Sequence, residues 1–132
     1  MELEKIRERF SKDLFAVESA GIVIVEAGEC SSVCELALDR RHKNAMGGVM
    51  GGAVFTLCDF AYAVAANGLD KPYTMSLSSS ISFLAQPKGK KLTARAECIK
   101  DGGHTCFYRV RVEDDAGVSV AEAEFTGYKL IK

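Results

Sequence analysis

Residues 42–59, HKNAMGGVMGGAVFTLCD, constrain the fold more than any other part of this chain. Four glycines fall within six residues, and an apolar run of helical character follows them. Asp59 is the only charged residue between Lys43 and Asp70. A lone carboxylate in an apolar helix is costly to bury unless it is paired or used, and glycines let the backbone approach another group closely. The stretch predicts N–H donors at a helix N-terminus with a carboxylate about two turns further on.

The length of 132 residues predicts a single domain over 1–132. A net charge of −1, without a basic block or basic–aromatic interleaving, excludes a nucleic-acid partner. The first residues, MELEKIRERF, lack the apolar segment of a secretory signal. The run 44–69 is uncharged apart from Asp59 at its centre, and this carboxylate and the glycines argue against a membrane span. We therefore expect a cytoplasmic protein with no membrane partner.

The five cysteines favour buried thiols over disulfides or a metal site. Their number is odd, no C-x-x-C occurs, and neither His42 nor His104 lies at metal-ligand spacing from a cysteine. We therefore expect no bound metal.

The first half of the chain predicts a helix, a hairpin and a second helix. Apolar residues spaced three and four apart predict an amphipathic helix over 2–15. A β-branched run at 22–25, a turn at 27–28 and alternation over 33–38 predict the hairpin. The second helix, over 51–66, ends at Asn67-Gly68. It has almost no polar face, so we expect it to be buried on all sides.

The second half predicts strands only. Alternating side chains over 74–83 are followed by three more strands, over 92–99, 106–113 and 118–130, with Gly-containing turns between them. We expect a meander of long strands. One apolar helix without a second helix layer must be covered by that sheet. The expected fold is α+β: a long curved antiparallel sheet wrapped around one central buried helix, plus an N-terminal amphipathic helix.

The motif in 42–52 resembles a family signature. The signature H-x-N-x-x-G-x-x-H-G-G, with an acid seven residues after the second glycine of its final pair, is matched by His42, Asn44, Gly47, Gly51-Gly52 and Asp59. It resembles the hotdog-fold acyl-CoA thioesterases, most closely the phenylacetate-pathway (PaaI-like) type. The segment ISFL at 81–84, followed by the turn PKG at 87–89, resembles the family's strand end and turn. The likeness covers essentially the whole chain.

This resemblance implies a thioester hydrolase (EC 3.1.2.-) that converts an acyl-CoA to the free acid and coenzyme A. It implies that Asp59 is the general base or nucleophile, that the Gly51 N–H holds the carbonyl oxygen, and that Asn44 and Ser76 orient carbonyl or water. No cofactor is implied apart from the coenzyme A of the substrate. In the family the site lies between subunits, which implies a homodimer or homotetramer.

Four further residues are expected to bind substrate: Met50, Gly52, Thr56 and His42. Gly52 and Thr56 share the helix face of Asp59, together with Tyr62 and Ala63, and small residues there leave room for an acyl chain. His42 heads the motif, although its charged neighbours favour an exposed or locally hydrogen-bonded ring. Met50 replaces the family histidine, and a thioether cannot donate a proton.

Other readings of the same residues stay open. Asp59 could pair with a neighbouring subunit only to fix assembly. Asn44 could form an Asx-turn and the glycines a tight strand-to-helix turn. Because of Met50, the main alternative function is a non-catalytic acyl-CoA-binding or regulatory hotdog protein. A hotdog dehydratase is less favoured, since no histidine lies beside the acid.

Overall fold

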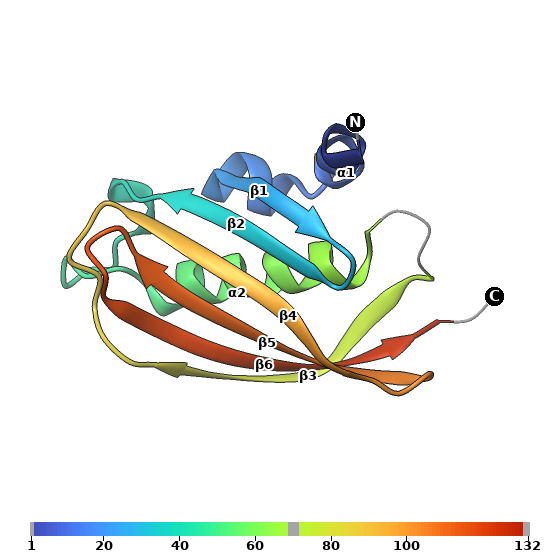
Figure 1. The fold of residues 1–132 in the computed structure, drawn as a ribbon. Helices are drawn as coiled ribbons and strands as arrows, with labels where there is room; N and C mark the ends of the chain where they lie inside the picture. The colour runs from blue at the N-terminus through green and yellow to red at the C-terminus, as the bar shows by residue number, and fades with distance from the viewer. Residues whose placement is uncertain (1, 69–71, 131–132) are drawn as a thin grey trace.

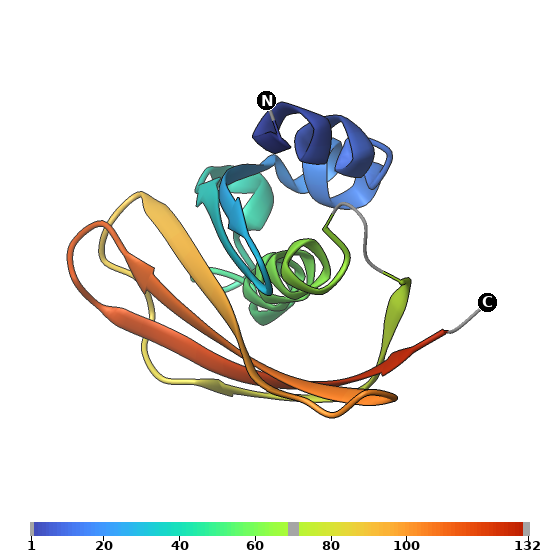
Figure 2. The same cartoon turned by 45° about the vertical axis from the view of Figure 1, so that its right-hand side comes forward.

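The computed structural model describes residues 2–68 and 72–130. Its elements, in chain order, are α1 (Glu2–Phe10), η1 (Phe15–Ala20), β1 (Ile22–Gly28), β2 (Ser31–Ala37), η2 (Arg40–His42), α2 (Gly51–Ala66), β3 (Thr74–Phe83), β4 (Lys91–Asp101), β5 (Thr105–Asp114) and β6 (Ser119–Lys129). The sheet curves around α2, while α1 and η1 lie beside the β1 side of the sheet (Figures 1 and 2). The predicted α+β architecture, with a helix inside a curved antiparallel sheet, is confirmed. Within the described part of the chain, no helix is long and apolar enough to cross a membrane.

The strand order is β1-β2-β4-β5-β6-β3, and neighbouring strands are antiparallel. The predicted meander is therefore correct for β4 to β6 and wrong for β3, which pairs with β6 at the far edge. The place beside β4 is taken by β2, in the register Ser31↔Glu97. Because α2 runs across the concave face, it leads the chain from β2 to the opposite edge of the sheet (Figure 1).

The core lies between α2 and the inward faces of the strands. Leu57, Cys58 and Ala61 on the helix are completely buried, as are Leu36 on β2 and Leu92 on β4. Alternation along the strands turns these side chains inward, and alanines on α2 let the sheet approach closely. A large apolar side chain buried in this way contributes about 1.5–3 kcal/mol.

The N-terminal segment differs from the single helix expected over 2–15. Helix α1 ends at Phe10, where the Ser11 hydroxyl and N–H both donate to the Glu8 carbonyl, at 2.6 and 3.2 Å. Apolar spacing alone could not reveal this competing side-chain bond. The chain then turns into η1, a wide π-helical segment closed by Gly21 at φ +89°.

The β1–β2 turn lies two residues later than predicted. Ala27 and Gly28 continue the ladder, opposite Ser32 and Ser31. The reversal uses residues 29–30, and Cys30 adopts φ +59°.

Helix α2 has the predicted bounds, but the expectation that it is buried on all sides is wrong for the single chain. Gly52 and Asp59 are exposed, and Thr56 and Ala63 are half-buried. These four residues form the open face of α2. The sheet and the N-terminal segment lie on different sides of α2 (Figure 2), and residues 13–16 of that segment line a cavity together with Thr56, Asp59 and Ala63.

Strand β3 forms an outer edge of the sheet. Most of its side chains are exposed, among them Met75, Leu77 and Phe83. A ten-residue edge with exposed apolar side chains is a surface on which another strand can pair.

Candidate active site

The loop before α2 is a tight turn built around Asn44. Its side-chain Oδ1 accepts from the N–H groups of Met46 and Gly48, both at 3.0 Å, and Gly47 has φ +87°. Asn44 therefore forms the Asx-turn that the sequence left open. Its side-chain Nδ2 makes no hydrogen bond to the described residues, so this donor is available to a bound molecule.

The N-terminus of α2 presents unused backbone donors. Met50 is the N-cap residue and offers no side-chain cap, while its carbonyl accepts from Ala53 and Val54 at 3.0 and 3.3 Å. Within the described residues, the N–H groups of Gly51 and Gly52 have no acceptor. These donors sit where the helix macrodipole is equivalent to roughly half a positive charge. Gly51 and Asn44 line one cavity of about 390 Å³. We call Asn44, Gly51 and Gly52 the donor half.

Gln86 holds this loop in place, which sequence reasoning did not predict. Its Oε1 accepts from the Val49 N–H at 2.9 Å, and its Nε2 donates to the Val49 carbonyl at 3.4 Å. The sequence indicated only the turn at 87–89 here, because a contact across 37 residues leaves no local signal.

Asp59 lies on the open face of α2, between two cavities. It lines a cavity of about 490 Å³ together with Ser76, and a second one of about 300 Å³ together with Thr56. It makes no ion pair or hydrogen bond with the described residues. Partial burial raises the pKa of Asp59, and the nearby charge of Asp13 raises it further. We call Thr56, Asp59 and Ser76 the acid half.

Asp13 lines both of these cavities and was missed from the sequence. The expected helix over 2–15 gave it no special role. In the structure it lies in the connection between α1 and η1, beside α2.

The remaining predicted residues have simpler roles in the single chain. His42 is buried: its Nδ1 accepts from the Asp39 N–H at 3.0 Å, so its Nε2–H donates to the Ala20 carbonyl at 2.7 Å. Both ring nitrogens are thus used locally rather than facing a ligand. Met50 is 51% exposed, beside Gly52. The Thr56 hydroxyl donates to the Gly52 carbonyl at 2.8 Å.

Cysteine chemistry is disfavoured next to Asp59. Cys58 is completely buried, and burial raises the pKa of its thiol to about 12. At neutral pH this thiol is protonated and packed in the core, so it is no nucleophile.

Among the cavities described above, which residues 2–68 and 72–130 line, none is lined by both halves. Asp59 follows Gly51 by eight residues on the same helix, which is about 12 Å along its axis. A nucleophile must approach its target carbonyl to about 3–3.5 Å. A thioester bound at Gly51 is therefore out of reach of Asp59 in the same chain.

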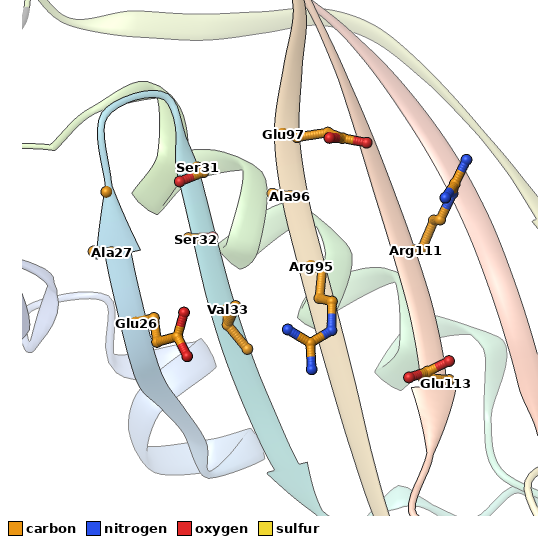
Figure 3. A pocket seen from close by; sticks show the side chains of 11 residues that line it. Glu26, Ala27, Ser31, Ser32, Val33, Arg95, Ala96, Glu97, Arg111 and Glu113 are labelled. Atoms are coloured by element: carbon orange, nitrogen blue, oxygen red, sulfur yellow. The ribbon is translucent and has the colours of Figure 1, made fainter. Parts of the chain in front are cut away.

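A larger cavity, of about 580 Å³, lies on the face of the sheet turned away from α2. Figure 3 shows the charged side chains of Arg95, Glu97, Arg111 and Glu113 along it. None of the predicted site residues lines it.

Comparison with known proteins agrees with this architecture. The profile of the thioesterase superfamily matches residues 46–121, which include α2 and β3. The fold and the two halves define a hotdog-fold protein of the thioesterase type. This chain belongs to the thioesterase superfamily.

Three relatives illustrate the likeness. The E. coli PaaI protein of the phenylacetic acid degradation operon has the same fold, with a TM-score of 0.84, 21% identity and coverage of 98% of this chain and 96% of that one. A hypothetical thioesterase of Streptococcus pneumoniae TIGR4, solved with coenzyme A, has a TM-score of 0.83 and 27% identity over 92% of this chain and 96% of that one. A protein of Archaeoglobus fulgidus named as a candidate esterase is 29% identical over 129 residues, which are 97% of this chain and 83% of that protein.

Proposed function

We propose that this protein is an acyl-CoA thioesterase, hydrolysing an acyl-CoA with water to a carboxylic acid and coenzyme A. One observation supports this most: within the described residues, a central helix presents uncapped N–H donors at its glycine end and, on its open face, a carboxyl without a hydrogen-bond or ion-pair partner. The pneumococcal relative solved with coenzyme A supports the same ligand class.

The two halves supply what thioester hydrolysis requires. The carbonyl oxygen gains negative charge as the tetrahedral intermediate forms, and the N–H groups of Gly51 and Gly52 are fixed donors for it. Asp59 either takes a proton from the attacking water or attacks the carbonyl carbon itself. In the second case a mixed anhydride forms on Asp59, and water then hydrolyses it to the free acid. Coenzyme A leaves as the thiolate and is protonated. Ser76, on the same cavity as Asp59, orients the water.

We further propose that two copies complete each site. The donor half of one protomer would face the acid half of its partner, because the two halves of one helix lie too far apart. An antiparallel pairing of the two α2 helices, with the β3 edges joined, brings Gly51 of one copy toward Asp59 of the other.

A screen of acyl-CoAs of different chain length and aromaticity, followed by release of free thiol, tests the activity. The proposal predicts turnover of at least one acyl-CoA by the wild type and a kcat about 10³-fold lower in Asp59→Asn. The alternative, a non-catalytic acyl-CoA-binding protein, is favoured by Met50 at the family's histidine position. It predicts saturable binding without thiol release, and that result would overturn the proposed activity.

Mixing two strongly impaired variants tests the shared site. Gly51→Pro removes one N–H donor, and Asp59→Asn removes the carboxylate. After joint refolding, half of the dimers are mixed and each holds one intact site, so about a quarter of wild-type activity should return. No recovery, with mixed dimers verified by mass, would place both halves in one chain and refute the two-copy site.

A further inference from the structure

Asp13 and Asp59 face the same two cavities from different elements. Asp13 comes from the connection between α1 and η1, and Asp59 from the open face of α2. We propose that Asp13 is a positioning residue for Asp59, placing a second carboxylate beside it and thereby setting the lower pH limit of hydrolysis. This inference rests on the proposed thioesterase function and adds a residue to its site.

Packing fixes the backbone of Asp13 against α2, although the side chains of Asp13 and Asp59 stay exposed in the single chain. The Asp13 N–H donates to the Phe10 carbonyl at 3.0 Å, and the Asp13 carbonyl accepts from the Val17 N–H at 2.9 Å. The Phe10 ring meets the Phe60 ring edge-on, with centroids 5.8 Å apart. Since Phe60 follows Asp59 directly in α2, this aromatic contact holds the N-terminal segment against the helix at the position of the acid.

Other ionisable groups surround the cavity of about 490 Å³ that Asp13 and Asp59 both line. Arg9 reaches it from α1, Tyr62 from α2 and Tyr73 from the segment before β3. Burial raises the pKa of the Tyr62 hydroxyl, which keeps it neutral near pH 7. This hydroxyl is buried over Gly127 of β6, without a hydrogen-bond partner among the described residues. Cys58, adjacent in sequence, is a protonated thiol.

Repulsion between two negatively charged carboxylates explains how Asp13 acts on Asp59. Burial raises the pKa of Asp13 itself. For Asp59 the pKa is raised first by burial and then by the negative charge of Asp13, despite Arg9 on the same cavity. A carboxylate with a higher pKa is a stronger base near neutral pH, but it is protonated and inactive over a wider acidic range. Removing the charge of Asp13 therefore lowers the pKa of Asp59 and extends activity to lower pH.

The test compares Asp13→Asn with the wild type in two measurements. The first is kcat/KM against pH, in which the acid limb should move to lower pH in Asp13→Asn. The second is the titration of the Asp59 carboxyl carbon by ¹³C NMR in the intact protein, whose midpoint should fall in the same direction. Asp59→Asn assigns that signal, and circular dichroism verifies folding.

Two variants serve as controls. Asp13→Glu keeps the charge and should retain the wild-type acid limb. Glu18→Gln removes an exposed carboxylate from the same N-terminal segment, outside both cavities, and should leave the limb in place.

The outcomes separate this inference from the function on which it rests. An unchanged limb and an unchanged NMR midpoint in Asp13→Asn overturn the role of Asp13. An equal shift in Glu18→Gln overturns it too, since overall charge would then explain the effect. If the wild type hydrolyses no acyl-CoA, the proposed function fails, and the NMR titration alone still decides whether Asp13 acts on Asp59.

Discussion

The donor half and the acid half lie on the same helix, yet different interactions hold them. The donor half consists mainly of backbone N–H groups, fixed by the Asn44 turn and by the two bonds between Gln86 and Val49. The acid half depends on one side chain, Asp59, whose protonation is governed by its surroundings. A backbone site tolerates changes of side chain but not of main-chain geometry, whereas a carboxyl site has the opposite sensitivity. A change of main-chain geometry should therefore impair the donor half, and a change of side chain should impair the acid half.

Asp59→Asn should have the largest effect. It removes the base or nucleophile while keeping the shape of the side chain, so kcat should fall by about 10³-fold. Folding and assembly should be unaffected, because Asp59 has no internal partner within the described residues. Thiol-release kinetics, circular dichroism and light scattering measure these effects. Activity within about tenfold of the wild type would remove Asp59 from the reaction.

Gly51→Pro should have the next largest effect, and it acts only on the donor half. Proline is favoured at the first helical position, and Met50 before it already has the extended conformation that proline requires, at φ −66° and ψ 135°. The helix should therefore persist without this N–H, and kcat should fall by about 10²-fold.

Gly51→Ala is the matched control for that substitution. It adds a Cβ about 3.1 Å from the Phe83 ring, as proline does, but it keeps the N–H. Equal losses in the two variants would mean that crowding, rather than the missing donor, lowers the rate.

Gln86→Ala should have a smaller effect on the donor half. Without the amide, the backbone of Val49 loses both partners, so kcat should fall by about tenfold through poorer positioning. The Val49 amide should exchange faster with solvent in hydrogen-exchange NMR. Lys90→Ala, on the same connection, is the control. A change in the acid limb of the pH profile would contradict the separation of the two halves.

Met50→His should have the smallest effect. The side chain is half exposed and takes no part in capping α2, so the backbone donors stay in place. We expect kcat/KM to rise or to stay unchanged, measured on the best acyl-CoA from the screen. A large loss would show that the binding surface is specialised for the thioether, and that the donor half is less tolerant of side-chain change than its backbone construction implies.

The sequence predicted the parts of the fold that local signals encode. The glycines before α2 and the Asn67-Gly68 end fixed that helix, and alternation over 74–83 fixed β3. It did not predict that β3 pairs with β6, because a strand with mainly small polar side chains shows no preference for one neighbouring strand over another. Strand order depends on where α2 carries the chain, which is a property of the whole fold.

Most of the predicted site residues come from one motif, and Ser76 was added only through the family resemblance. The motif brought Asn44, Gly51 and Asp59 to attention, and the structure places them around cavities of the predicted helix. Asp13 and Gln86 were missed because each acts on a residue at least 37 positions away in the chain. His42 also belongs to the motif, but its ring hydrogen-bonds to the Ala20 carbonyl and does not line the candidate site.

The bare outer edge of β3 has a consequence beyond the site. Under the proposed pairing, the β3 edge is covered only when two copies associate. Association therefore stabilises the fold, and thermal stability depends on protein concentration. The melting temperature should climb as the solution is made more concentrated. Dilution should lower the thermal stability and the hydrolytic activity of the protein together.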